Sequence, residues 1–109
     1  MPVTRKPLHF LGSSLRDLRA FPDEARRDAG FNLDFVQRGL DPSDWKPMKD
    51  VGMGVKELRM HDATGAFRVI YLATRPEGVY VLHRFQKKTR KTPKADIDLA
   101  ASRLRQIGG

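Results

Sequence analysis

An arginine, Arg68, stands in the middle of the segment AFRVIYLA, where its neighbours are almost all apolar or aromatic. A charged side chain within an apolar strand has to be paired or to serve a function. A guanidinium group can bind phosphate in a bidentate manner and stabilise the negative charge that develops on a pentavalent phosphorane. Arg68 is therefore a candidate for phosphate chemistry, and the structural alternative is an ion pair with Glu57.

Two further side chains are candidates for acid–base catalysis beside Arg68. Glu57 is either the ion-pair partner of Arg68 or a general base for a ribose 2′-hydroxyl. His83 titrates near neutral pH and is expected at the end of a strand, where it is either catalytic or structural. Metal-free RNA cleavage requires an oriented 2′-hydroxyl, a stabilised phosphorane and a protonated leaving oxygen, and positioning can replace part of the acid–base contribution.

A strongly basic segment, LHRFQKKTRKTPK, occupies residues 82–94 and contains no acidic side chain. The net charge of +8 is concentrated in residues 51–109, which hold twelve Lys or Arg against five Asp or Glu. Positive charge arranged in this one-sided way attracts polyanions, either nucleic acid or an acidic protein, unless it serves solubility alone. The candidate contacts to RNA or the ribosome are Arg59, Arg84, Lys87, Lys88, Arg90 and Lys91.

Other classes of chemistry find no support in the sequence. The chain has no cysteine, and its three histidines fall in separate segments without the spacing of metal ligands. No Gly-rich phosphate loop or nucleophile elbow is present, so we expect neither a metal nor another cofactor. No apolar run approaches the roughly 20 residues of a membrane-spanning helix, and the N-terminus does not resemble a signal peptide. We expect one soluble, cytoplasmic domain over residues 1–109.

The first half of the chain predicts a strand and a pair of helices. Residues 7–11 read as a short strand, and residues 14–20 as a short helix. A second helix is expected to begin at Pro22 and to end at Gly39, because Pro suits a first turn and Gly a helix end. Its apolar stripe has helical spacing and consists of Ala25, Ala29, Leu33 and Val36.

The second half predicts a sheet and a last helix. Residues 41–54 read as a loop, in which Trp45 is a packing anchor or a base-stacking platform. Three β-branched and aromatic segments then form an antiparallel meander, at residues 55–60, 66–73 and 78–85. Side-chain alternation directs Leu58, Met60, Phe67 and Val69 toward the helices and Arg68, Glu57 and Arg59 to the other face. Thr92 and Pro93 start the final helix, whose apolar stripe is Ile97, Ala101, Leu104 and Ile107.

The expected order of elements is β-α-α-β-β-β-α, which is an α+β fold. A small antiparallel sheet is packed by an N-terminal helical hairpin and by a C-terminal helix. In this arrangement, Arg68 lies on a sheet face close to the basic segment.

Two segments, VKELRMHDATGAFRVIYLA and VYVLHRFQKKTRKTP, resemble the RelE/ParE superfamily of type II toxin–antitoxin toxins, and they look closest to its phage-derived, HigB-like branch. The resemblance covers almost the whole chain and implies a RelE-like fold. It also implies a small basic toxin that is neutralised by a cognate antitoxin, in this branch usually a helix-turn-helix DNA-binding protein. RelE-like members cleave mRNA in the ribosomal A site, whereas ParE-like members inhibit DNA gyrase.

The resemblance also assigns roles to individual residues. Arg68 matches the arginine of the RelE-type YRLVY strand, which contacts the scissile phosphate, and Lys87, Lys88 and Arg90 match a region that contacts rRNA and mRNA. Two features depart from the RelE pattern. The lysines of the preceding strand are replaced here by Val55 and Glu57, and the C-terminal catalytic Tyr or His has no counterpart in ASRLRQIGG.

The implied function is a ribosome-dependent mRNA endoribonuclease in which Glu57 or His83 supplies acid–base catalysis, or in which positioning suffices. Two alternatives remain open. One is a ParE-like toxin that inhibits gyrase by binding, and the other is a phage-derived nucleic-acid-binding protein without toxicity.

Overall fold

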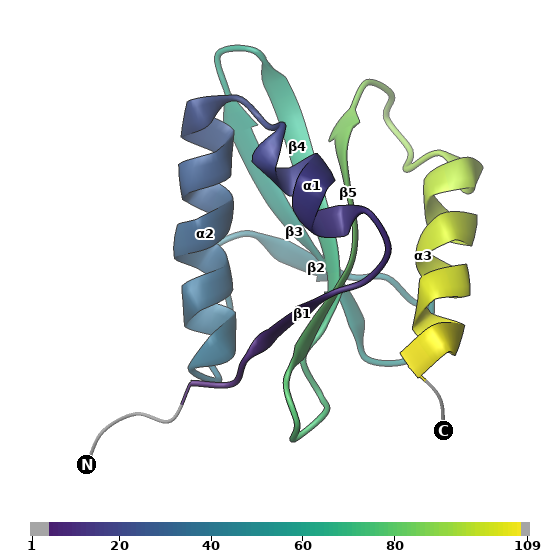
Figure 1. Cartoon of the computed structure of the whole chain (residues 1–109). Helices are drawn as coiled ribbons and strands as arrows, with labels where there is room; N and C mark the ends of the chain where they lie inside the picture. Colours follow the sequence, from purple (N-terminus) through teal and green to yellow (C-terminus); the bar gives the residue numbers. More distant parts are fainter. Residues whose placement is uncertain (1–4, 108–109) are drawn as a thin grey trace.

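A five-stranded sheet forms the centre of the protein in the computed structural model, which describes residues 5–107 (Figure 1). In chain order, the elements are β1 (Leu8–Phe10), α1 (Ser14–Arg19), α2 (Asp23–Gln37), β2 (Trp45–Pro47), β3 (Val55–Asp62), β4 (Gly65–Leu72), β5 (Val79–Lys87) and α3 (Lys94–Ile107). The strands lie side by side in the order β1-β5-β4-β3-β2. The predicted α+β class is therefore observed, with one strand more than expected.

One face of the sheet is covered by α1 and α2. The predicted stripe of α2 is buried against the sheet, and the apolar side chains that alternation directed to this face are buried there too. This first core contains Leu18, Phe21, Ala25, Ala29, Leu33, Val36, Leu58, Met60, Phe67, Val69, Tyr71, Val79 and Val81. Both predictions, the helical stripe and the inward face of the meander, are confirmed.

The opposite face is only partly covered, because α3 packs over β4 and β5 and leaves part of β2 and β3 without a helix (Figure 1). The second core includes the predicted stripe of α3 and the sheet residues Val55, Ile70, Leu72, Leu82 and Phe85. A β-bulge contributes to this packing, since Ile70 pairs with His83 while Tyr71 pairs with Val81. Leu82 is thereby placed as an additional residue of β5 in contact with the α3 core.

Both edges of the sheet differ from the prediction. Residues 45–47 were expected in a loop but form β2, which pairs antiparallel with β3. The N-terminal strand β1 pairs parallel with β5, so the sheet is mixed and not purely antiparallel. Both short strands cover what would otherwise be the free edges of a three-stranded meander, where unpaired backbone groups favour association with other chains.

The ends of other elements were also predicted imprecisely. β3 and β5 continue to Asp62 and Lys87, each two residues beyond the expected end, and the helix after β5 begins at Lys94. The Thr92 hydroxyl, which was expected to cap this helix, donates a hydrogen bond to the carboxylate of Glu57. Among residues 5–107, no helix is long and apolar enough to span a bilayer.

Candidate nucleic-acid interface

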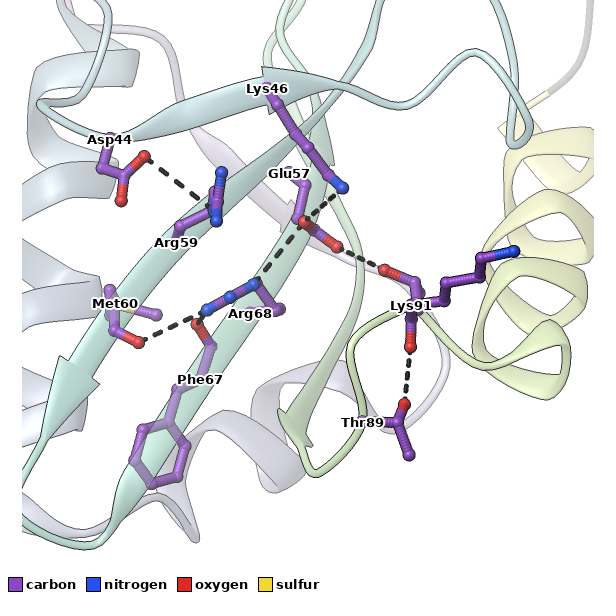
Figure 2. A network of polar contacts seen from close by, with 10 residues as sticks. Asp44, Lys46, Glu57, Arg59, Met60, Phe67, Arg68, Thr89 and Lys91 are labelled. Carbon is purple, nitrogen blue, oxygen red and sulfur yellow. Dashed lines mark hydrogen bonds and ion pairs between the residues drawn. The ribbon is translucent and has the colours of Figure 1, made fainter.

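A row of charged side chains crosses β2, β3 and β4 on the face that α3 leaves partly uncovered (Figure 2). The strand register places Arg59 of β3 directly opposite Arg68 of β4, and Lys46 of β2 directly opposite Glu57 of β3. Directly opposed residues share a sheet face, and like charges in such a pair repel each other. The two arginines therefore need anions close by, and Asp44 and Glu57 supply them.

Arg68 is held at its position by backbone and side-chain acceptors together. Its Nη1 donates to the Phe67 carbonyl oxygen at 2.9 Å and lies 3.5 Å from the Met60 carbonyl oxygen, while its Nε lies 3.6 Å from Glu57 Oε1. The side chain is only 3% exposed. Burial lowers the pKa of Arg68, and the neighbouring Glu57 carboxylate opposes that shift. The guanidinium is thus an oriented, charged group just beneath the surface.

Glu57 is the point at which three elements meet. Besides Arg68 of β4, Lys46 Nζ of β2 lies 3.8 Å from Glu57 Oε1 (Figure 2). Thr92 Oγ1 donates to Glu57 Oε2 at 3.1 Å. The carboxylate is fully buried. The predicted ion pair between Glu57 and Arg68 is present, whereas the role of general base stays a prediction, since no part of Glu57 is accessible to a substrate hydroxyl in this conformation.

The accessible positive charge of the row belongs to Lys46, Arg59 and Lys87. The side chains of Lys46 and Arg59 are 42% and 36% exposed. Lys87 pairs with Ala66 at the end of β5, and its pKa is lowered by partial burial and by the charge of Arg68. The three cations lie around the buried Arg68, and positive charge gathered in this way favours a bound anion.

The connection between β5 and α3 carries the remaining predicted contacts. Lys88, Arg90 and Lys91 are exposed on it. The Thr89 hydroxyl donates to the Lys91 carbonyl oxygen at 2.6 Å (Figure 2). The hydrogen bond from Thr92 to Glu57 attaches the end of the connection to β3. We name residues 88–93 the basic loop; it is fixed to the charged row at one end by Thr92 and at the other by β5.

Two predicted site residues lie elsewhere. Arg84 pairs with Val69 on the face that packs against the helices, where its Nη2 lies 3.8 Å from Asp17 Oδ1 and its guanidinium lies 5.0 Å from the centre of the Phe21 ring. The structure therefore separates Arg84 from the charged row. Its contacts support the docking of α1 on the sheet.

His83 lies on the same sheet face as Arg68, but α3 covers it. Its Nε2 is 2.7 Å from Asp96 Oδ1, and its ring stacks on that of Phe85 at 5.5 Å. Ile70 of β4 is the register partner of both Glu57 of β3 and His83 of β5, which lie on either side of it. Two strand spacings, about 10 Å, therefore separate the backbones of Glu57 and His83. The two candidate acid–base residues therefore do not form one site: Glu57 contacts Arg68, and His83 contacts Asp96.

Sequence reasoning missed Lys46, Asp44 and Thr92. Lys46 and Asp44 lie in or beside β2, which was read as a loop, and Thr92 was assigned to a helix cap. Alternation in β2 places Trp45 and Lys46 on opposite faces. Trp45 is half-buried, with the Lys56 ammonium 4.2 Å from its ring centre, which fits the packing alternative better than base stacking beside the row.

No group of three or more His, Cys, Asp or Glu side chains that could hold a metal ion occurs in the part of the chain that the structure describes. The charged row itself consists of arginine and lysine side chains with two carboxylate counter-ions, Asp44 and Glu57. Such an arrangement can attract, orient and neutralise phosphate groups.

Comparison with known proteins gives one assignment. No curated protein matches the chain. The model of a family described as phage derived protein Gp49-like (DUF891) matches residues 16–105, from α1 through α3, which is most of the chain and includes the whole charged row and the basic loop. The protein therefore belongs to the Gp49-like family of phage-derived proteins.

Proposed function

We propose that this protein is the toxin of a type II toxin–antitoxin system, a ribosome-dependent and metal-independent mRNA endoribonuclease that inhibits translation. The observation that carries the proposal is the pair of arginines Arg59 and Arg68, directly opposed on a sheet face and flanked by Lys46, Lys87 and the basic loop. This arrangement favours a ligand with several closely spaced negative charges, as a nucleic-acid backbone has.

The proposed role of Arg68 is to stabilise the phosphorane formed at the scissile phosphate. Its guanidinium is already oriented by the Phe67 and Met60 carbonyl groups, so little reorganisation is needed in the transition state. Because Arg68 is buried behind the contact between Thr92 and Glu57, the basic loop has to move before a phosphate reaches it. Arg59 and Lys46, which are accessible, would bind the backbone first.

The burial of Glu57 and His83 supports dependence on the ribosome. Glu57 is enclosed by its partners, and His83 is engaged with Asp96. The free protein therefore presents neither residue as an accessible base, and cleavage relies on orientation of the 2′-hydroxyl in a larger complex. Lys46 of β2 lies beside Glu57, which occupies one of the two positions where RelE-type toxins carry a lysine on the strand.

The partners in this proposal are the ribosome with its mRNA and a cognate helix-turn-helix antitoxin, all in the cytoplasm. An acidic antitoxin segment that covers the charged row and the basic loop would neutralise the same cations that bind RNA. Inhibition then requires no conformational change in the toxin.

The burial of Glu57 and His83 is also compatible with a second candidate, a ParE-like toxin that inhibits DNA gyrase by binding alone. A phage-derived nucleic-acid-binding protein without toxicity would use the charged row in the same way. Neither function needs an accessible acid or base, so the location of Glu57 and His83 is compatible with both.

Induced expression tests the proposal against both alternatives. We expect growth arrest that the antitoxin reverses, a collapse of protein synthesis in pulse labelling, and cleavages at codon positions when primer extension is run on a translated mRNA. Early arrest of DNA synthesis would instead identify a gyrase inhibitor, and normal growth would identify the non-toxic protein.

Variants of the row test the site itself. Arg68→Ala is expected to abolish growth arrest. Arg59→Ala, at a position whose side chain is 36% exposed, is expected to raise the inducer concentration required for arrest by at least about tenfold. Arg105→Ala, which removes an exposed cation of α3, is the charge-matched control and should remain toxic. A folded and fully toxic Arg68→Ala protein would show that the site is assigned wrongly.

A further inference from the structure

A pocket of about 430 Å³ lies beside Arg59, between α2 and the start of β2 and the end of β3. Its lining includes Phe31, Asn32 and Phe35 from α2, Asp44 before β2, and Arg59 and His61 from β3. The pocket and the charged row share Arg59 and Asp44. A ligand that is bound by the row can therefore extend into the pocket.

The pocket has an accessible aromatic wall. Phe31 is 65% exposed, and its ring makes an edge contact with that of Phe35 at 4.9 Å, which fixes its position on the surface of α2. A single exposed phenylalanine is common on protein surfaces. Phe31 differs because it borders a pocket that also contains polar groups, and an aromatic side chain in such a place can stack with a nucleobase.

The polar side chains of the pocket can recognise the edge of a base. Asn32, Asp44 and His61 provide donors and acceptors around the aromatic wall. Arg59 Nε is buried and lies 3.9 Å from Asp44 Oδ1, too far for a hydrogen bond, and it has no hydrogen-bond partner within residues 5–107. A buried donor without a partner costs stability, and a ligand that accepts from it would remove that cost.

The charges in the pocket distinguish a base from other ligands. Asp28 and Asp44 contribute to its lining, and two carboxylates repel both a phosphate group and an acidic peptide segment. The same carboxylates accept hydrogen bonds from the amino and imino groups of a base. Phosphate is therefore favoured on the arginine side, and a neutral, flat, hydrogen-bonding group is favoured on the Phe31 side.

We propose that this pocket binds one unstacked base of a single-stranded RNA, whose adjoining phosphate lies on the accessible Arg59. The proposal rests on the proposed function and adds a base-binding subsite to it. Phe31 stacks on the base, Asp44 and Asn32 contact its edge, and Arg59 links base and backbone. Specificity for an unpaired nucleotide follows, because a base within a duplex is not free to enter the pocket.

Equilibrium binding to a short fluorescent single-stranded RNA tests the subsite, with a set of matched oligonucleotides in which each position in turn is abasic. For the wild type, we expect one abasic position to weaken binding at least about fivefold. Phe31→Ala should bind the intact RNA as weakly as the wild type binds that abasic RNA. Phe31→Trp should again bind the intact RNA more tightly than the abasic RNA. Leu40→Ala, which removes another exposed apolar side chain outside the pocket, is the control.

The outcomes separate the subsite from the proposed function. If the wild type binds RNA and Phe31→Ala behaves identically on every oligonucleotide, the base-binding proposal is wrong while phosphate binding by the row stands. If neither protein binds any of the oligonucleotides, the base-binding proposal is wrong, and the growth and primer-extension assays decide the proposed function separately. If Phe31→Ala leaves RNA binding unchanged but weakens binding to ribosomes stripped of mRNA, the pocket is a docking site for the ribosome and the proposal is also wrong.

Discussion

At the scale of single residues, the buried pair of Glu57 and Arg68 determines both stability and access to the site. Glu57 is fully buried and Arg68 nearly so, and their closest charged atoms are 3.6 Å apart. Removing one charge of a buried pair typically costs about 3–5 kcal/mol, because the other charge is left without compensation. The pair is therefore expected to be a major determinant of the fold around β3 and β4.

Glu57→Gln is expected to lower the free energy of unfolding by about 3 kcal/mol at neutral pH. The double variant Glu57→Gln/Arg68→Met should recover much of that loss, because no buried charge then remains unpaired. Urea denaturation of the three proteins measures the difference. Asp41→Asn is the control, since its exposed ion pair with Lys56 at 2.9 Å should contribute less than about 1 kcal/mol. Equal effects of Glu57→Gln and Asp41→Asn would contradict this account.

The sequence was informative about this pair and uninformative about its surroundings. Arg68 was identified as a candidate because it is a charged residue in an apolar strand, and the pairing of adjacent strands predicted Glu57 as its neighbour. Thr92 comes to Glu57 from 35 residues away, and Lys46 comes from a strand with no recognisable pattern. Contacts of this kind depend on tertiary packing, which side-chain periodicity does not encode.

At the scale of elements, α3 is attached to the rest of the fold through a buried arginine. Arg103 donates from Nη1 to the Leu82 carbonyl oxygen at 2.9 Å and from Nη2 to Ser13 Oγ at 3.2 Å. Its guanidinium lies against Gly12, whose φ of +56° is in the left-handed region. The helix, β5 and the start of α1 are thus joined at one point.

Gly12→Ala should disturb this junction. The added Cβ would lie 2.7 Å from Arg103 Nε, and alanine is strained at this positive φ. We expect a loss of about 2 kcal/mol in the free energy of unfolding, measured by thermal and urea denaturation. Gly30→Ala is a matched control, because its Cβ on α2 meets nothing within 4 Å and should stabilise the helix by about 1 kcal/mol. Similar effects of both substitutions would refute the proposed role of Gly12.

The long helices and strands were predictable because each is long enough for its apolar residues to repeat at the spacing of a helix or a strand. The stripe of α2 and the alternation in β3 and β4 identified their inward faces correctly. The three-residue strands β1 and β2 are too short to show a period, and their pairing with β5 and β3 is set by the free edges of the meander. The mixed sheet was missed for this reason.

At the scale of the whole molecule, the two sides of the sheet have different charge. The basic loop and the charged row lie on the side of α3, while α1 and α2 form the other side, where aspartates accompany the arginines (Figure 1). Residues 1–50 carry nine Lys or Arg against eight Asp or Glu, whereas most of the net charge of +8 comes from residues 51–109. The proposed function requires that the RNA backbone bind on the α3 side of the sheet.

Salt dependence of RNA binding tests which side is used. Each phosphate that a cation neutralises contributes about −0.7 to the slope of log K against log salt concentration for a single strand. Replacement of Lys88, Arg90 and Lys91 of the basic loop by alanine should therefore reduce the magnitude of the slope by about 2. The control replaces three exposed arginines of the helical side, Arg19, Arg26 and Arg27, and changes the net charge equally. If binding depended only on net charge, both triple variants would change the slope alike; a change confined to the loop variant identifies the basic loop as the surface that contacts the RNA backbone.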